Sequence, residues 1–234
     1  LSLMISLLQH PQVIPFEACH NTLWVLANMA CCNENMQHMA SNTRLLDTVI
    51  QVANMRQTPE EESTNANIET ARLNSQHALR LQHSAFRCLL NLSWEQENKI
   101  LMSDRQDLVD TIVRIVETKT LPAAEGGGGD AQHKAFVTML LQARLFALGT
   151  LRNIAHTPPT QKLRLCTAQD GMLLNLLCDT ASSDEDLAVR GKTFAVVFNL
   201  VSPETSDILI SHPRLIDLLV EAALVPDHLP GTSS

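Results

Sequence analysis

Four asparagines stand in the same local phrase of this chain, and that repetition is the strongest constraint on how it can fold. Each has an aliphatic residue two positions before it, a large apolar residue five before, a small residue six before and an apolar residue directly after it. Positions −5, −2 and +1 are three residues apart, so they lie on one side of a helix and form its buried stripe. Four helices of one design indicate a repeat protein. The four asparagines are Asn28, Asn91, Asn153 and Asn199.

The asparagines themselves lie outside the buried stripe, on the helix face that also carries positions −4, −7, −8 and −11. One explanation is local, because an asparagine near a helix end can cap it or bond to the neighbouring turn. The other is a row of side-chain amides along one surface of the molecule. Four copies in one register favour the row.

The segments after the asparagines repeat as well. A short polar break is followed by a short helix, a second apolar helix and a longer third helix that ends in the next asparagine phrase. We therefore predict an all-α chain of about four three-helix units in one domain over residues 1–225. The expected units are a partial first repeat 1–31, repeats of about 32–93, 94–155 and 156–201, and a partial last repeat 202–225, with a flexible tail at 226–234.

The units are unevenly spaced, and the excess length falls at one joint. The intervals between successive asparagines are 63, 62 and 46 residues, and only the last is close to the roughly 40–47 residues of such repeats. The excess is assigned to two loop inserts, 56–76 and 118–132, which both separate a second helix from a third. Polar and glycine-rich segments of this kind bury too little apolar surface to order themselves. We expect them to project from one edge, either as functional loops or as tolerated loop growth.

Composition agrees with helices packed through aliphatic side chains. The chain is 45% hydrophobic but only 3% aromatic, without tyrosine. No stretch alternates with period two, which argues against a sheet, and no run of about 18 apolar residues suggests a membrane span. The apolar start Leu1 to Leu8 is expected to be the second helix of a repeat. It would then need cover from an N-terminal continuation of the same chain or from a neighbouring protein.

The sequence offers little for catalysis or metal binding. The six cysteines are expected to be reduced thiols of an intracellular protein, cytoplasmic or nuclear, that serve as small hydrophobic groups. Cys31, Cys32 and His38 could be imagined as metal ligands, but no second pair stands at ligand spacing. The glycine run 126–129 is not followed by the lysine and hydroxyl residue of a phosphate loop. We predict no enzyme, no metal and no cofactor.

The three-helix unit, and above all Trp24-Val25-Leu26-Ala27-Asn28-Met29-Ala30, resembles the armadillo repeat, whose third helix ends in a similar Trp-x-Leu-x-Asn-Leu-x phrase. The resemblance covers nearly the whole chain. It implies a right-handed α-α superhelix like those of β-catenin and the importin-α adaptors, with third helices lining a concave groove. In that family the ladder asparagines bind the backbone of an extended peptide. The residues implied here are Asn28, Asn91, Asn153 and Asn199, with Trp24 and Arg87 at position −4.

The pattern departs from that of the nuclear-import adaptors, in which tryptophan recurs at position −4 and clamps lysine stems. The second, third and fourth units carry Arg87, Gly149 and Ala195 there. This departure speaks against a basic nuclear-localisation peptide as ligand.

The distribution of charge points to an acidic ligand instead. The formal net charge is −8, yet residues 74–93 and 131–155 contain no acid and carry Arg80, Arg87, Lys134, Arg144 and Arg152. A neutral to positive groove on an acidic protein suits an acidic or phosphorylated partner segment, and it adds Arg152 to the candidate site. Nucleic acid fits less well, because the chain is acidic and poor in aromatic residues for base stacking.

Two alternatives remain open at this stage. The chain could be a structural solenoid segment of a larger protein, packing on neighbouring domains, with asparagines that only bond between repeats. It could also be a nuclear-import-type adaptor. The accessibility of the asparagine amides, and whether they have partners within the protein, separates a binding row from structural ties.

Overall fold

The regular structure of the chain is entirely helical over the residues that the computed structural model describes, 1–11, 13–55, 68–118 and 130–224. This confirms the all-α prediction for that part of the chain. The elements are α1 (Ser2–Gln9), α2 (Phe16–Met29), α3 (Asn33–Ser41), α4 (Thr43–Ala53), α5 (Ile68–Leu92), α6 (Gln96–Ser103), α7 (Gln106–Glu117), α8 (Asp130–Ile154), α9 (Pro159–Thr167), the 3-10 helix η2 (Ala168–Gly171), α10 (Met172–Ser183), α11 (Leu187–Leu200), α12 (Ser206–Ser211) and α13 (Leu215–Leu224).

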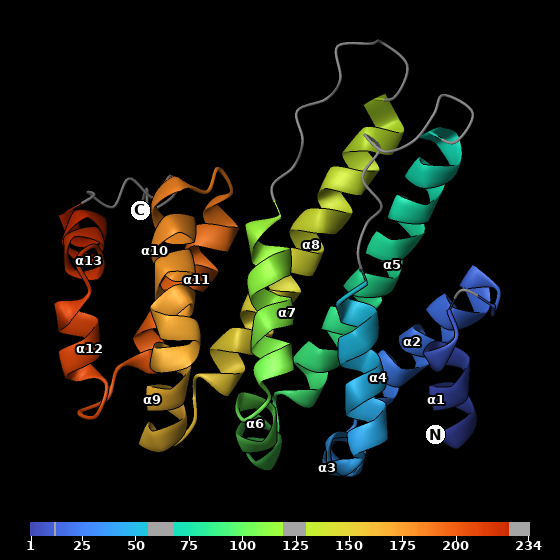
Figure 1. The fold of residues 1–234 in the computed structure, drawn as a ribbon, viewed down its shortest axis with the longest axis horizontal. Coiled ribbons are helices and arrows are strands. Elements are labelled where there is room, and N and C mark those ends of the chain that lie inside the picture. The colour runs from blue at the N-terminus through green and yellow to red at the C-terminus, as the bar shows by residue number, and fades with distance from the viewer. Residues whose placement is uncertain (12, 56–67, 119–129, 225–234) are drawn as a thin grey trace, which may run out of the picture.

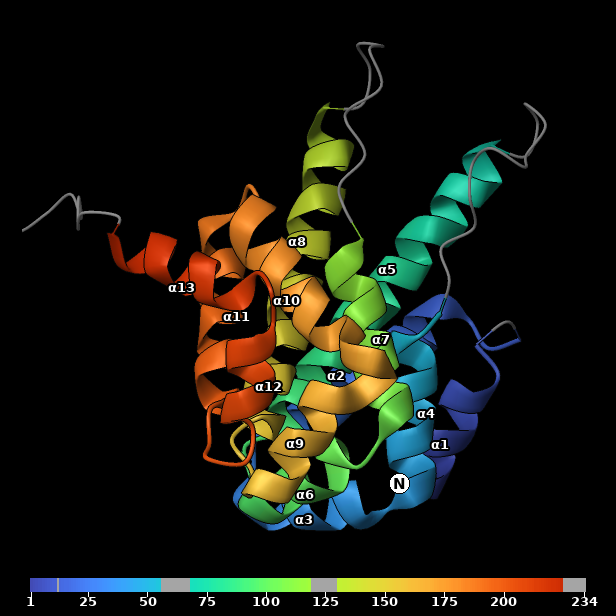
Figure 2. The ribbon, with the colours of Figure 1, turned by 60° about the vertical axis from the view of Figure 1, so that its left-hand side comes forward.

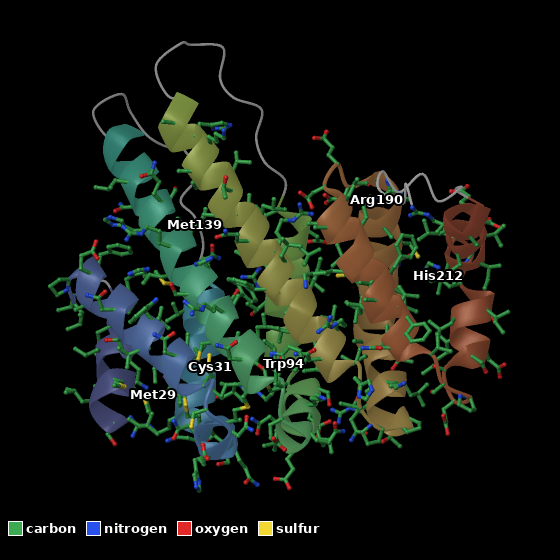
Figure 3. The ribbon with its side chains drawn as sticks, turned by 180° about the vertical axis from the view of Figure 1, so that it is seen from behind. Met29, Cys31, Trp94, Met139, Arg190 and His212 are labelled. Carbon is green, nitrogen blue, oxygen red and sulfur yellow. The ribbon has the colours of Figure 1, made fainter. Side chains whose placement is uncertain are left out.

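The helices lie in rows, and within each row every helix contacts the next (Figure 1). The third-helix row consists of α2, α5, α8 and α11, and each of its helices ends in an asparagine phrase. A second-helix row of α1, α4, α7, α10 and α13 packs against it. The short helices α3, α6 and α9 follow one another along the edge of the molecule that is lowest in the view (Figure 2). Viewed from behind, the third-helix row faces the reader (Figure 3).

The buried stripe explains why these helices pack as they do. Positions −5, −2 and +1 of the asparagine phrase supply fully buried side chains in most units, among them Leu23, Phe86 and Leu151. The small residues at position −6 are buried too, which lets neighbouring helices approach closely. One contiguous hydrophobic core runs from Ile5 to Leu218. The apolar pattern of the sequence therefore specifies the core correctly.

The expected inserts are shorter than predicted. The third helices begin earlier, because α5 starts at Ile68 and α8 at Asp130. Residues 68–76 and 130–132 are therefore helical rather than loop, and the prediction of irregular structure was wrong for them. Extending a helix that is already nucleated adds one hydrogen bond for each residue ordered, so a polar sequence without glycine or proline can continue it. Residues 56–67, 119–129 and 225–234, which include the rest of both inserts and the expected tail, lie outside the described residues.

The apolar start of the chain is partly covered by the chain itself. Helix α1 packs on α2 and α4 and buries Ile5 and Leu8, whereas Leu1 and Leu3 stay exposed.

The stretch His133–Ile154 of α8 is long and apolar enough to cross a membrane by length and composition. Counting consecutive apolar residues does not detect this property. The same stretch packs between α5 and α11 and buries Ala147, Leu148 and Leu151 in the core. Core packing is thus an alternative account of its apolar composition.

A side-chain donor nine positions before each asparagine ties every third helix to the second helix of its own unit. The donors differ in chemistry, but all reach carbonyls in the last turn of the second helix or just after it, where a helix generally supplies no further N–H donor. The bonds are Cys19 Sγ to Leu7 O (3.6 Å), Gln82 Nε2 to Ala53 O (3.2 Å) and Met55 O (2.8 Å), Arg144 Nε to Val116 O (3.1 Å), and Arg190 Nε to Ala181 O (2.8 Å).

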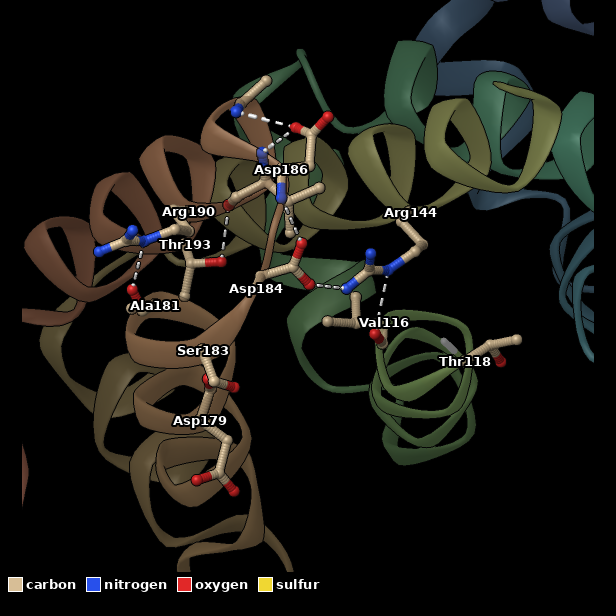
Figure 4. A network of polar contacts seen from close by, with 12 residues as sticks. Val116, Thr118, Arg144, Asp179, Ala181, Ser183, Asp184, Asp186, Arg190 and Thr193 are labelled. Atoms are coloured by element: carbon tan, nitrogen blue, oxygen red, sulfur yellow. Dashed lines mark hydrogen bonds and ion pairs between the residues drawn. The ribbon is translucent and has the colours of Figure 1, made fainter. Parts of the chain in front are cut away.

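The donor Arg144 also joins two units through an ion pair (Figure 4). Its guanidinium binds the carboxylate of Asp184, and both side chains are only 10% exposed. The other oxygen of Asp184 accepts the backbone N–H of Asp186, which in turn caps the first turn of α11 through Ala188 and Val189. One arginine therefore connects the ends of α7 and α10 with the start of α11.

We predict that Arg144→Met lowers the free energy of unfolding by about 3 kcal/mol, because it leaves the Asp184 carboxylate buried without its partner. Arg164→Met, which breaks the exposed ion pair with Asp104, is the matched control and should cost less than about 1 kcal/mol. Urea titration followed by circular dichroism measures both.

Adding Asp184→Asn to Arg144→Met should restore part of the loss, because a neutral amide is cheaper to bury than a carboxylate. Equal losses for Arg144→Met and Arg164→Met would contradict the assigned role.

Candidate functional site

The asparagines lie near the C-terminal ends of successive helices of the third-helix row. The amide nitrogens of Asn91, Asn153 and Asn199 each donate a hydrogen bond to the preceding unit. Asn91 Nδ2 donates to the carbonyl of Ala27 at 2.8 Å, and Asn199 Nδ2 donates to the carbonyl of Arg152 at 2.9 Å. In both cases the acceptor directly precedes the asparagine of the preceding unit.

Between the second and third units, the asparagine reaches the corresponding carbonyl indirectly, through a serine hydroxyl. Asn153 Nδ2 donates to Ser93 Oγ at 3.0 Å, and Ser93 Oγ donates to the carbonyl of Leu90 at 2.7 Å. Leu90 directly precedes Asn91, so all three junctions address the same position of the preceding helix.

These carbonyls need a partner because each helix ends within the next turn. In a continuing helix, the N–H groups of Cys31 and His156 would donate to these carbonyls. Each donates instead to the carbonyl of the next residue, Cys31 N to Asn28 O at 3.1 Å and His156 N to Asn153 O at 3.0 Å. The carbonyls of Ala27 and Arg152 are thereby left without an intrahelical partner. The next asparagine supplies it, so Asn91 and Asn199 act as caps provided by the neighbouring unit.

The residue directly after each asparagine has its carbonyl capped by the segment that follows it in the chain. A polar side chain of the following turn or short helix donates to it in every unit. The bonds are Asn35 Nδ2 to Met29 O (3.2 Å), Asn98 Nδ2 to Leu92 O (2.9 Å), Thr157 Oγ1 to Ile154 O (2.9 Å) and Thr205 Oγ1 to Leu200 O (2.7 Å).

The four asparagines are not equally available to a ligand. Asn28, Asn91 and Asn199 are half-buried, whereas Asn153 is buried and also accepts from Arg152 Nη2 at 3.3 Å. Asn28 accepts from Arg87 Nη2 at 3.2 Å. Within the described part of the chain, the side-chain oxygens of Asn91 and Asn199 accept no hydrogen bond. They remain able to accept a peptide N–H.

Exposed aromatic side chains flank the asparagines. Trp24 is 53% exposed in α2, and Trp94, just after α5, is 56% exposed and lies beneath the Arg152 guanidinium, whose carbon is 5.9 Å from the ring centroid. Phe198, next to Asn199, is 78% exposed. The sequence analysis missed Trp94 and Phe198; the rarity of aromatic residues in this chain was the signal that could have identified them.

The structure explains why position −4 carries no tryptophan in the third unit. A Cβ atom on Gly149 would lie 3.0 Å from Leu90 Cδ1 in α5. This position faces the neighbouring helix rather than a ligand, so a large side chain would separate α5 from α8.

The cations of the third helices fall into two groups. Arg80 and Arg144 pair with Glu17 and Asp184. Among the described residues, Arg87, Arg152 and Lys192 pair with no carboxylate. Burial and the nearby charge of Arg152 lower the pKa of the Lys192 ammonium. Lys134 and Arg190 of the same row also pair with no carboxylate among the described residues, so only part of the uncompensated positive charge lies near the asparagines.

No group of three or more histidine, cysteine or acidic side chains in the described residues is arranged to hold a metal ion. All six cysteines are free thiols. Cys31 and Cys32 are exposed, and Cys32 Sγ donates to the Glu34 carboxylate at 2.6 Å rather than to a shared centre.

We expect Cys31 and Cys32 to react with a maleimide at pH 8 at least ~100-fold faster than the four buried thiols, because the thiolate is the reactive form and access is required. Burial raises the pKa of Cys88 to about 12 and that of Cys166 to about 11. Mass spectrometry after timed labelling measures each site, with a urea-unfolded sample as control. Rapid labelling of Cys88 in the folded protein would contradict the packing.

Comparison with known proteins adds no identification: no family model matches the sequence, and no curated protein matches it.

The direction of the amide hydrogen bonds gives a sharp test of the inter-unit caps. Asn199→Asp replaces the donor with an oxygen that faces the Arg152 carbonyl, so we predict a loss of about 2 kcal/mol in unfolding free energy. Asn28→Asp keeps the acceptor for Arg87 and makes that bond charge-assisted. Both residues are second to last in their helices, so the effect of a negative charge on the helix dipole is similar.

Urea midpoints should therefore fall clearly for Asn199→Asp and stay nearly unchanged for Asn28→Asp. If the two variants lose the same stability, the asparagine amides do not tie the units together.

Proposed function

We propose that this chain is a protein-binding scaffold of the armadillo type that holds an extended, acidic or phosphorylated peptide segment along its third-helix row. The succession of contacts within each helix row supports a solenoid of about four three-helix units. In the proposed assembly it winds as a right-handed superhelix.

The observation that carries the proposal is the unpaired guanidinium of Arg152 over the exposed indole of Trp94, with two further unpaired cations in the same helix row. Arg87, Arg152 and Lys192 lack a carboxylate partner among the described residues, although the formal net charge is −8. Tryptophan and arginine are the side chains that most often dominate binding energy at interfaces. A peptide with acidic residues would supply the missing charges and favour rapid association.

The asparagines have a secondary role in this proposal. The Asn91 amide nitrogen donates to the Ala27 carbonyl and to Cys31 Sγ, and that of Asn199 donates to the Arg152 carbonyl. The side-chain oxygens of both residues can still accept a backbone N–H of the ligand. Asn153 is buried and acts through Arg152, which it holds in place. Specificity then comes mainly from Trp24, Arg87, Trp94 and Arg152.

A peptide array provides the test. Acidic and phosphorylated peptides should bind, while peptides with glutamine in place of the acids should not. Arg87→Glu and Arg152→Glu should each weaken binding at least ~10-fold, about 1.4 kcal/mol, and should flatten its dependence on salt.

Arg44→Glu in α4 is the matched control, because Arg44 is exposed in the second-helix row and the change in net charge is the same. If the control weakens binding as much as the other variants, only the net charge matters and the site is misplaced.

The inter-unit caps favour a second candidate, a structural solenoid segment that packs on neighbouring domains. In that case the asparagines act as ties alone. Replacing Asn91 and Asn199 together by alanine should then lower stability without changing the affinity for any acidic peptide. The import-adaptor alternative is not supported, because Gly149 packs on Leu90 where a lysine clamp would be needed.

A further inference from the structure

Trp94 and Arg152 form a preorganised cationic contact where α5 and α8 end beside each other (Figure 3). The guanidinium lies over the indole, and its Nη2 donates to Asn153 Oδ1 at 3.3 Å. The backbone of Arg152 is held in turn by Asn199 at 2.9 Å. Trp94 and Asn153 therefore restrict the Arg152 side chain, and less conformational entropy is lost when it binds a ligand.

A second cation lies within electrostatic reach of the first. Lys192 of α11 is half-buried, and both its burial and the charge of Arg152 act against its protonated form and lower its pKa. Neither cation forms an ion pair with any described acid. Glu95, the carboxylate next to Trp94, directly precedes α6 and makes no ion pair with Arg152 or Lys192.

We infer that Trp94, Arg152 and Lys192 form a subsite for the phosphate monoester of a phosphorylated serine or threonine in the bound peptide. This inference rests on the proposed peptide-binding function and narrows its ligand class. A stacked guanidinium keeps its in-plane N–H groups available for a bidentate contact with phosphate oxygens.

The two cations favour phosphate over carboxylate because of charge. A phosphate monoester carries a charge of about −1.5 to −2 at pH 7 and three acceptor oxygens. It can neutralise the guanidinium and the ammonium together, whereas a single carboxylate leaves one of them uncompensated. A dianion therefore stabilises protonated Lys192 beside Arg152 more than a single carboxylate does.

The experiment compares three fluorescein-labelled peptide mixtures that differ only at the central residue: phosphoserine, glutamate or serine, with Asp and Glu among the flanking residues. Fluorescence anisotropy gives the dissociation constant of each. For the unmodified protein the phosphoserine mixture should bind at least ~10-fold tighter than the glutamate mixture, since two added charge-assisted bonds distinguish them.

The variants test which residues produce this ratio. Lys192→Met and Arg152→Lys should each reduce it to about twofold or less, because one removes a charge and the other removes the bidentate fork. Lys99→Met in α6 is the matched control and should leave the ratio unchanged. Both affinities are measured on the same variant, so partial unfolding scales them equally and does not alter their ratio.

The outcomes separate this inference from the proposed function. If glutamate and phosphoserine peptides bind equally well, or if Lys192→Met keeps the preference, the subsite is wrong while acidic-peptide binding stands. If no mixture binds, the proposed function and the subsite are both wrong. Binding of phosphatidic acid vesicles or of polyuridylate that depends on Arg152, without peptide binding, would overturn the assignment to a phosphopeptide.

Discussion

The structure depends on how each third helix satisfies its last carbonyl groups. A helix that ends inside a packed protein leaves polar groups that water cannot reach freely, and an unsatisfied carbonyl costs about 1–3 kcal/mol. Here the carbonyls before Asn28 and Asn153 are capped directly by the next unit, and the one before Asn91 is capped by Ser93, which the next unit holds through Asn153. The carbonyl after each asparagine is capped by the following turn or short helix. Hydrogen bonding therefore requires that the units be stacked, which couples local helix termination to the global arrangement.

A second set of bonds fixes the relation between the helices within each unit. The donors Cys19, Gln82, Arg144 and Arg190 occupy one register and address one kind of acceptor, the end of the second helix. These donors lie nine residues before the asparagines. Each third helix is therefore hydrogen-bonded to its neighbours at two positions along its length, and the apolar stripe supplies the bulk of the packing.

Some polar and aromatic groups of the third-helix row take no part in these stabilising contacts. The charge of Arg144 is neutralised by its ion pair with Asp184. Arg152, about two turns further along the same helix, lies over the exposed indole of Trp94. The contrast shows that basic residues of one helix do not form a single surface. Among the cations without an ion pair, Arg87 and Arg152 hydrogen-bond to asparagines of the third-helix row and are the ones proposed to recognise an anionic ligand.

The sequence alone determined the helical class, the buried stripe and the register of the repeating unit, because side-chain periodicity along a helix is a local property. The long third helices were predicted too short, since helix extension through polar residues depends on the turns already formed. The sequence also brought Asn91, Asn199 and Arg152 into one candidate group. Only the tertiary structure decided which atom each amide addresses, because those partners lie 47 to 64 residues away. The donors at position −9 were hidden for the same reason: they occupy one register and reach the same kind of acceptor, but Cys19, Gln82, Arg144 and Arg190 do not share one residue type.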